Sequence, residues 1–426
     1  MNSNDIFVSL DIGTSNIKVI IGEMVDESLN IIGVGTAPSQ GLNKGAIVDI
    51  DETVRSIKKA VEQAERMVGV QIESVIVGVG GNHIALQPCH GVVAVSSEDR
   101  EIRNEDVIRV IEAAEVVSIP PEREIIDVIP RQFIVDGLDE INDPRGMIGV
   151  RLEMEGTIIT GSKTILHNLL RCVEKAGLVI ADICLQSIAA GSIALSRDER
   201  ELGVALIDIG GGCTTISVFE EGYLRKTSVI PVGGEHITKD ISVGLRISTE
   251  EAERVKLKHG HAFIDLSTDE EVFKVTRIGS AKEEEYNQFE IAHIIEARVT
   301  EMIEMVDKEL EGLGYPNLPG GYVLTGGVAS MPGVLELSQY ILENNVRVAS
   351  PDYLGVREPK YTVGVGLIQF TYRNVKIQGR EVAAGISHEL PPKPKKKVAD
   401  QKKKRNDESN SNVVTKVKSF FGSFFD

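Results

Sequence analysis

The sequence is poor in the residues that build metal sites and disulfide frameworks. Its 426 residues include no tryptophan, four cysteines and eight histidines. The cysteines, at positions 89, 172, 184 and 213, stand far apart, and no pair has CxxC spacing. Zinc sites and disulfide frameworks need ligands in close or regular spacing, so the sequence predicts neither.

Long apolar segments are also missing. No uninterrupted apolar run reaches the ~18 residues that span a bilayer. The first residues, Met1-Asn2-Ser3, are polar and lack the basic and apolar regions of a signal peptide. These absences predict a protein that is made and kept in the cytoplasm.

Positive charge is scarce outside the end of the chain. The formal net charge is −18, and residues 391–426 hold ten lysines and arginines against four acids. That segment therefore carries +6 and the remainder carries −24. An acidic body repels phosphate backbones, which argues against general nucleic-acid binding.

Two segments repeat one pattern of strand, aspartate, glycine-containing tip and strand. One lies at 7–21 around Asp11 and the other at 204–219 around Asp208. Apolar residues on both sides of each tip predict β-hairpins. Glycine amides can approach an anion, and an aspartate can hold hydrated Mg²⁺. One such tip is more typical of an ordinary turn, but two can grip a polyphosphate from both sides.

A third glycine element, Gly326-Gly327, follows the strand-like run 322–325, and Pro332-Gly333 then opens a helical pattern. The motifs DIGTS, DIGGGCT and LTGGVA, in that order, resemble the actin, Hsp70 and sugar-kinase superfamily of ATP-binding proteins. The resemblance implies an α/β, two-lobed actin-like fold, which is a duplicated ribonuclease-H-like ATPase fold. ATP and Mg²⁺ would lie in the cleft between the lobes.

The same resemblance implies roles for single residues. Asp11 and Asp208 would flank Mg²⁺ through water, and Lys18 would point at the phosphates. Glu253 and Lys256 would be aimed at the ribose and base. The expected nucleotide-binding set is Asp11, Gly13, Thr14, Ser15, Asn16, Lys18, Asp208, Gly210, Gly211, Gly212, Thr214, Gly233, Gly234, Glu253, Lys256, Gly326 and Gly327.

Gln186 precedes the second hairpin, at a crossing where the superfamily places a polar residue that positions the attacking water. The resemblance makes it the catalytic candidate. A residue at a helix start that bonds to backbone explains it equally well. Enzymatic activity therefore stays open, as a weak ATPase at most.

Residues 84–162 form a different pattern, in which strand-like and helix-like segments alternate without any cluster of catalytic residue types. They predict a small inserted α/β subdomain, either structural or partner-binding. Together with the stretch 41–54, they resemble the FtsA family of bacterial cell-division proteins. In that family an inserted subdomain replaces the one found at this corner in actin, and filaments form under the membrane.

One segment imitates a phosphate-binding loop. Residues 156–164 nearly match a P-loop, but Ser162 stands where the lysine belongs, and the apolar centre suits a strand. No G-x-G-x-x-G opens a helix after the first strand, which disfavours a dinucleotide-binding fold.

Helical periodicity predicts a helix after Asp51, taken as its N-cap, and a long helix over 289–311. The polar side of the long helix carries Arg298, and such charges normally face solvent. In the FtsA family this region binds the acidic C-terminal tail of the tubulin-like protein FtsZ. The resemblance therefore makes Arg298 a candidate partner contact.

The end of the chain predicts a second functional part, a flexible linker followed by an amphipathic helix. Residues 380–411 are charged and poor in large apolar groups, which is typical of a flexible linker. Residues 412–426 follow as an amphipathic helix, and an anionic membrane interface fits its apolar face better than a groove on a partner protein. Its apolar face holds Val413, Val414, Val417, Phe420, Phe421, Phe424 and Phe425, and its polar face holds Lys416 and Lys418.

These patterns predict five parts. The first actin-like lobe takes residues 1–83, 163–198 and 353–379, with the inserted subdomain at 84–162. The second lobe takes 199–352, with an outer part at about 229–300. The linker at 380–411 and the tail helix at 412–426 follow.

The resemblance to the FtsA family implies an actin-like ATP-binding cell-division protein at the cytoplasmic face of the membrane, at the division septum. It would tether FtsZ filaments, self-associate into filaments and help recruit later division membrane proteins. A small-molecule kinase of the same superfamily is the alternative, although no base toward a substrate hydroxyl can be identified. A chaperone would need a β-rich peptide-binding domain where only a linker and a helix follow.

Overall fold

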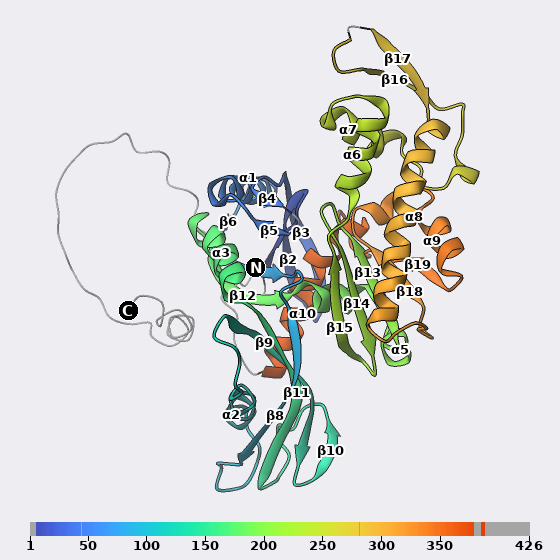
Figure 1. Cartoon of the computed structure of the whole chain (residues 1–426). Coiled ribbons are helices and arrows are strands. Elements are labelled where there is room, and N and C mark those ends of the chain that lie inside the picture. The colour runs from blue at the N-terminus through green and yellow to red at the C-terminus, as the bar shows by residue number, and fades with distance from the viewer. Residues whose placement is uncertain (1–5, 44, 281, 379–384, 388–426) are drawn as a thin grey trace, which may run out of the picture. The chain divides into compact units, whose positions relative to one another are not determined.

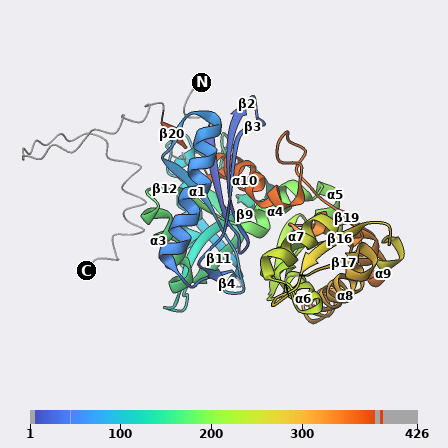
Figure 2. The ribbon, with the colours of Figure 1, turned by 90° about the horizontal axis from the view of Figure 1, so that it is seen from above.

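A computed structural model describes residues 6–43, 45–280, 282–378 and 385–387, all within one compact unit, Met1–Glu389. Two five-stranded sheets form the centres of two lobes, and a third sheet belongs to an insertion (Figure 1). In the view of Figure 2, α6, α7, α8 and α9 gather on one side and α1 and α3 on the other. The α/β two-lobed fold predicted from the sequence is confirmed.

The first lobe is built on the sheet β12-β7-β1-β2-β3. Apolar side chains point to both faces of its inner strands, so β1 and β7 are buried almost throughout. Its strands are β1 (Ile6–Ile12), β2 (Asn16–Val25), β3 (Ser28–Pro38), β7 (Ser74–Val79) and β12 (Val179–Leu185), and the short β4 (Leu42–Asn43), β5 (Ala46–Ile47) and β6 (Gln71–Ile72) lie beside it. Its helices are α1 (Ile50–Val68), α3 (Lys163–Lys175), α4 (Gln186–Ala194) and α10 (Thr362–Gln378).

The second lobe repeats this topology in the sheet β15-β14-β13-β18-β19. In both sheets a three-stranded antiparallel meander is followed by two parallel strands, so β1 corresponds to β13, β2 to β14 and β7 to β18. Its strands are β13 (Val204–Ile209), β14 (Thr214–Glu220), β15 (Tyr223–Ile230), β18 (Tyr322–Thr325) and β19 (Val346–Val348), with the outer hairpin β16 (Val272–Thr276) and β17 (Glu283–Asn287). Its helices are α5 (Arg197–Leu202), α6 (Gly234–Leu245), α7 (Thr249–His259), α8 (Gln288–Gly312) and α9 (Val334–Leu342), and short 3₁₀ turns lie at Ile264–Leu266, Val328–Ser330 and Pro359–Tyr361.

The insertion leaves the first lobe after β7 and returns to it at α3. Its antiparallel sheet has the order β10-β9-β11-β8 and is packed against α2. Phe133, Leu152 and Met154 are fully buried there, and each contributes about 1.5–3 kcal/mol relative to exposure. The insertion therefore has a core of its own. Its elements are β8 (Ala85–Ala94), α2 (Asn104–Ala114), β9 (Arg123–Val135), β10 (Leu138–Ile141) and β11 (Arg151–Ser162).

The segment that imitates a P-loop lies mostly in β11, in register with β8 and β9. Its backbone groups are used by the sheet ladder on both sides, so they are not free to wrap a phosphate. The prediction of a strand at this place is confirmed.

The N-cap predicted for the helix after Asp51 is wrong by two residues. Asp49 has extended backbone, and its Oδ1 accepts from the Glu52 N–H at 3.0 Å. The helix therefore begins at Ile50, and Asp51 lies in the first turn. There its negative charge interacts favourably with the positive end of the helix dipole.

Helix α10 lies within 353–379, the range expected in the first lobe, and packs on α4, β1 and β7. The two helices approach closely because Gly366 faces α4. A Cβ at Gly366 would lie 2.0 Å from the Ala189 carbonyl oxygen. This packing fixes the start of α4, which borders the site described below.

The described chain ends beside its beginning. Strand β20 (Ile386–Ser387) pairs antiparallel with β6, and the Gly385 N–H donates to the Ile6 carbonyl at 3.1 Å. Ile386 is buried. Residues 385–387 are therefore held against the first strand of the first lobe.

Candidate functional site

The first hairpin joins β1 to β2 through the tip 13–16, and its register places Asp11 opposite Lys18. Lys18 Nζ lies 2.8 Å from Asp11 Oδ2, and Gln186 Nε2 donates to Asp11 Oδ1 at 2.9 Å. Both oxygens of this carboxylate therefore have partners. Burial alone would lower the pKa of Lys18, but attraction by Asp11, with a smaller part from Asp208, raises it.

Gln186 is the first residue of α4, and its side chain reaches a carboxylate rather than backbone. The reading of Gln186 as a residue bonded only to its own helix start is therefore wrong. Its amide orients Asp11 at the floor of the cleft. A role in positioning water stays a prediction.

The second hairpin has the same tip length and a different pairing. Its register places Asp208 opposite Thr215, the position that Lys18 occupies in the first hairpin. Within the described part of the chain, no side chain or amide donates to the Asp208 carboxylate. Burial raises the pKa of Asp208 to about 6, Lys18 lowers it in part, and the nearby Asp11 charge raises it further.

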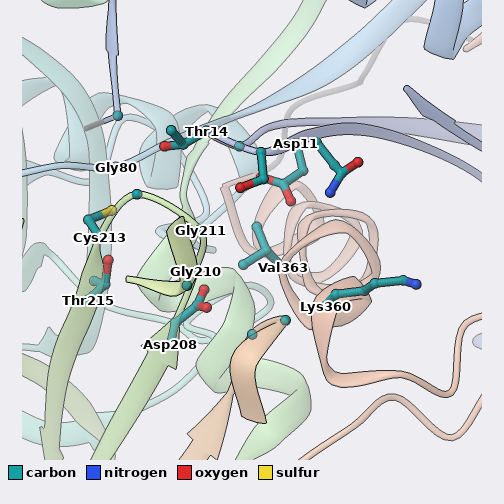
Figure 3. A pocket seen from close by; sticks show the side chains of 18 of the residues that line it. Asp11, Thr14, Gly80, Asp208, Gly210, Gly211, Cys213, Thr215, Lys360 and Val363 are labelled. Atoms are coloured by element: carbon teal, nitrogen blue, oxygen red, sulfur yellow. The ribbon is translucent and has the colours of Figure 1, made fainter. Parts of the chain in front are cut away.

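The two tips meet across the cleft (Figure 3). A Cβ at Gly211 would lie 1.8 Å from Ser15 Oγ, and a Cβ at Gly212 would lie 2.7 Å from Thr14 Cγ2. Ser15 Oγ also donates to Glu235 Oε1 at 2.9 Å. Glycine is therefore required in the second tip because the first tip occupies the space beside it.

Gly326 closes one side of Asp208. Its φ of +89° is in the left-handed region, and a Cβ there would lie 2.3 Å from Asp208 Oδ1 and 2.5 Å from the Ile209 carbonyl. Only glycine satisfies both conditions without strain. The third glycine element thus reaches the same cleft as the two hairpins.

The remaining wall comes from α6 and α7. The N–H groups of Gly234 and Glu235 donate to the carbonyls of Gly210 and Gly211, each at 2.9 Å. On α7, Lys256 Nζ donates to Glu253 Oε2 at 2.6 Å. The start of α6 is therefore bonded directly to the second hairpin tip.

One cleft of about 620 Å³ collects nearly the whole predicted set. Its lining includes Asp11, Gly13, Thr14, Ser15, Asn16, Lys18, Gln186, Asp208, Gly210, Gly211, Gly212, Gly234, Glu253, Lys256, Gly326 and Gly327. Two predicted residues do not line it. The Thr214 hydroxyl donates to the Val232 carbonyl at 2.8 Å, and Gly233 lies behind Gly234, against the second tip.

Other residues of the lining were not predicted. Thr215 lines the cleft, where Thr214 was expected. The register of the hairpin identifies it, because Thr215 is the residue that pairs with Asp208 across the four-residue tip. Cys213 belongs to the tip itself, and burial raises the pKa of its thiol to about 11. Gly80 and Lys360 also line the cleft. A strand ending in glycine signals Gly80, while Lys360 follows no motif in the sequence.

The cleft suits a polyphosphate with a cation. Cys213, Gly210 and Gly13 belong to tips whose backbone bends around a glycine, and such bends direct N–H groups at anions. Asp208 is a mostly buried carboxylate without a protein donor, which is the chemistry that Mg²⁺ satisfies. Asp11 already has Lys18 and Gln186, so Asp208 fits the cation better. The described ranges, the cleft included, hold no group of three or more histidine, cysteine, aspartate or glutamate side chains that could bind a metal ion.

Arg298 lies away from the cleft, on α8. Its Nε donates to Asp240 Oδ2 at 2.5 Å, its Nη2 donates to Oδ1 at 3.1 Å, and it also pairs with Glu301. The bonds to Asp240 raise the pKa of Arg298. The guanidinium therefore joins α8 to α6 and is partly exposed.

The predicted tail helix, with Val413, Lys416, Phe420 and the other candidate membrane residues, lies outside the described residues. Most of the predicted linker lies outside them too. At residues 385–387 the linker prediction is wrong, because Ile386 is buried and strand β20 pairs with β6. Among the helices that the structure does describe, none combines the length and the apolar character needed to cross a membrane.

Comparison with known families and relatives covers almost the whole chain. The family profile described as "Cell division protein FtsA" matches residues 205–366, and that of the "SHS2 domain inserted in FTSA" matches residues 81–160. The cell division protein FtsA of Bacillus subtilis is 64% identical over 389 residues, which are 91% of this chain and 88% of that protein. The protein of the same name from Escherichia coli is 34% identical over 380 residues, covering 85% and 89%.

Solved structures show the fold. The structure titled "PilM-PilN type IV pilus biogenesis complex" matches with a TM-score of 0.58 at 16% identity, covering 87% of this chain and 98% of that one. MreB5 of Spiroplasma citri, bound to ADP, matches with a TM-score of 0.53 at 16% identity, covering 88% and 98%.

Proposed function

The chain belongs to the FtsA family of cell-division proteins, and from this premise we propose that it binds ATP and tethers FtsZ filaments to the inner face of the cytoplasmic membrane. One observation carries the proposal. Two aspartate-led hairpins from two lobes face each other across a cleft in a chain 64% identical to a named FtsA.

In this proposal the protein supplies binding and orientation for the nucleotide. The amides of the two tips receive the phosphates, and Lys18 offsets their charge from the side of Asp11. Mg²⁺, when bound beside Asp208, neutralises phosphate charge that the acidic walls would otherwise repel. The raised pKa of Asp208 fits this role, because a cation relieves the cost of burying its charge.

The membrane arm of the proposal rests on the tail. Half-burying its seven large apolar side chains would contribute on the order of 5–10 kcal/mol, before the costs of folding and immobilising the helix. One tail therefore gives reversible attachment, and an array of tails on a filament gains avidity. Self-association, lipid binding and placement at the septum belong together in this proposal.

The FtsZ arm involves α8. An acidic peptide could pair with Arg298 only by exchanging bonds that Asp240 and Glu301 now make. The side chain is 25% exposed, so such an exchange is sterically open. Recruitment of later division proteins would use the inserted subdomain, whose core is independent of the lobes.

Vesicle sedimentation tests the tethering function. Purified FtsZ should pellet with vesicles that contain phosphatidylglycerol only when this protein and Mg-ATP are present. A chain lacking Val413–Asp426, or one with Phe420→Ser and Phe424→Ser, should leave both proteins in the supernatant. The matched control carries Thr415→Ala and Ser423→Ala on the polar side. Pelleting of FtsZ by the truncated chain would contradict the membrane role.

A further inference from the structure

The inserted subdomain contacts both lobes, and polar side chains join it to the first. Glu124, near the start of β9, has its Oε2 at 2.7 Å from His167 Nε2 of α3. On α10, the Asn374 and Gln378 amides donate to the two carboxylate oxygens of Asp127, each at 3.3 Å. Two helices of the first lobe therefore hold the base of the inserted subdomain.

Its contact with the second lobe is made by Arg131 of β9 and Tyr223, the first residue of β15. The Tyr223 hydroxyl donates to the Arg131 carbonyl at 2.6 Å, and the guanidinium carbon lies 5.0 Å from the centre of the tyrosine ring. The Arg131 Nε is buried and has no acceptor among the described residues. Both residues also line a cavity of about 30 Å³. An unpaired buried donor and a cavity each cost free energy, so this contact is held less firmly than a fully packed one.

Strand β15 connects the Arg131–Tyr223 contact to the second phosphate-binding tip. It runs antiparallel to β14 over Tyr223–Ile230. Near its far end, Val229 lines the cleft together with its cross-strand partner Thr215. At ~3.3 Å per residue, the strand spans roughly 20 Å. A rotation of the second lobe would therefore move Tyr223 and this wall of the cleft together.

The Arg131–Tyr223 contact coexists with a cleft whose two tips touch. Ser15 Oγ of the first tip donates to Glu235 Oε1 of the second lobe at 2.9 Å, and Gly211 lies against the same hydroxyl. The inserted subdomain is fixed to the first lobe, so lobes that separated at the tips would also pull Tyr223 away from Arg131. Both contacts therefore belong to one closed arrangement of the lobes.

We propose that the Arg131–Tyr223 contact couples the inserted subdomain to nucleotide binding, because it holds the second lobe in the closed arrangement that grips the phosphates. Neither residue lines the cleft. The coupling depends on the proposed binding of ATP and adds a route by which the subdomain and the nucleotide affect each other. Linkage requires the effect to be reciprocal, so bound nucleotide must stabilise the contact as much as the contact stabilises bound nucleotide.

Calorimetry of the full chain with Mg-ATP measures the effect on affinity. Tyr223→Ala and Arg131→Ala should each weaken binding roughly threefold to tenfold, the range that one hydrogen bond or one cation–π contact supplies. Tyr223→Phe keeps the ring and should lose less. The double variant should bind no more weakly than Tyr223→Ala, because both residues act through one contact. Tyr340→Ala and Arg171→Ala, at exposed sites, are the matched controls and should leave the affinity unchanged.

Hydrogen exchange followed by mass spectrometry measures the reciprocal effect. In the wild type, Mg-ATP should slow amide exchange severalfold at the tip 210–213 and also at 124–131 of β9 and 224–230 of β15. In Tyr223→Ala the slowing at β9 should be lost, while the tip stays protected by its direct contact with the nucleotide. A purely structural role of the tyrosine would not change how β9 responds to the ligand.

Three results would overturn the coupling. They are an unchanged Mg-ATP affinity in folded Tyr223→Ala and Arg131→Ala chains, additive losses in the double variant, and slower exchange at the tip without any change at β9 in the wild type. If circular dichroism shows that Tyr223→Ala does not fold, Tyr223→Phe and Arg131→Ala supply the same test. Failure of the wild type to bind Mg-ATP would instead overturn the proposed function, so the two failures are distinguishable.

Discussion

The two hairpins are equal in topology and opposite in electrostatics. In the first, Asp11 is neutralised by Lys18 and held by Gln186. In the second, the equivalent partner position is Thr215. Asp208 forms no ion pair with any described residue, and the charge of Lys18 lowers its pKa only in part. In a duplicated fold, one carboxylate can therefore be paired within the protein while the equivalent carboxylate of the other half has no protein partner and can bind a ligand. The difference resides in one pair of cross-strand residues.

Breaking the first pair should have the largest effect. Lys18→Met leaves Asp11 buried with its charge uncompensated and beside Asp208, and removing one partner of a buried pair costs about 3–5 kcal/mol. Chemical denaturation should show this loss in the free energy of unfolding. Lys226→Met, on an exposed site of β15, is the control and should change stability by less than ~0.5 kcal/mol. Equal stability of both variants would show that Asp11 does not depend on Lys18.

The packing around the second aspartate can be tested independently of charge. Gly326→Ala must hold a left-handed backbone and place Cβ against Asp208 Oδ1, so it should lower the free energy of unfolding by about 2–3 kcal/mol. Gly327→Ala is a matched control, because a Cβ there meets no atom within 4 Å. Thermal melts of the two variants should therefore differ by several degrees.

Neutralising the second aspartate should sharpen the contrast with the first. Burial raises the pKa of Asp208 to about 6 in the folded protein, above its ordinary value of 3.8. The folded protein therefore binds a proton between these values that the unfolded chain has released, so the wild type loses stability as pH rises through this window. In EDTA without nucleotide, Asp208→Asn should be more stable by about 1–3 kcal/mol at pH 7 and equal at pH 4.

Asp11→Asn should go the other way, because it removes the carboxylate that pairs with Lys18. Denaturation of both variants from pH 4 to pH 8 checks the signs. If Asp208→Asn were less stable than the wild type at pH 7, its carboxylate would have an unrecognised partner.

Making the second pair like the first should have the smallest effect. Thr215→Lys places a cation opposite Asp208, which should reduce the stability loss between pH 4 and pH 6 and stabilise the nucleotide-free protein by about 1 kcal/mol or less. It should also weaken the dependence of ATP binding on Mg²⁺. Thr276→Lys, at an exposed site of β16, is the control and should leave the pH profile unchanged.

Local patterns predicted the parts of the site that local structure builds. Strand alternation and the tips at 13–16 and 210–213 gave both hairpins, and a count across each tip gives the pairs Asp11–Lys18 and Asp208–Thr215. Thr215 lines the cleft, whereas the predicted Thr214 lies one residue earlier and donates to the Val232 carbonyl. Adjacent residues of a strand point to opposite faces, so a shift of one residue moves the side chain to the other side of the sheet.

The contacts that join distant segments were beyond the sequence. Ser15 meets Glu235, and Lys256 uses its donors on Gly234 and Thr238, because of how α6 and α7 pack on the second sheet. No spacing in the chain indicates such packing. Residues matched to a motif can therefore be placed in the expected cleft while their contacts with distant segments stay unpredicted. The boundaries proposed for the five parts likewise stay predictions.

The pairing of β20 with β6, and of Gly385 with Ile6, has a mechanical consequence. Whatever force is applied to the chain beyond Ser387 is delivered through a few backbone hydrogen bonds to the start of β1, the strand that carries Asp11 at its far end. Strand β1 thus connects the place where residues 385–387 are held to the hairpin that carries Asp11, so a pull on the chain after Ser387 acts on the strand at the floor of the cleft.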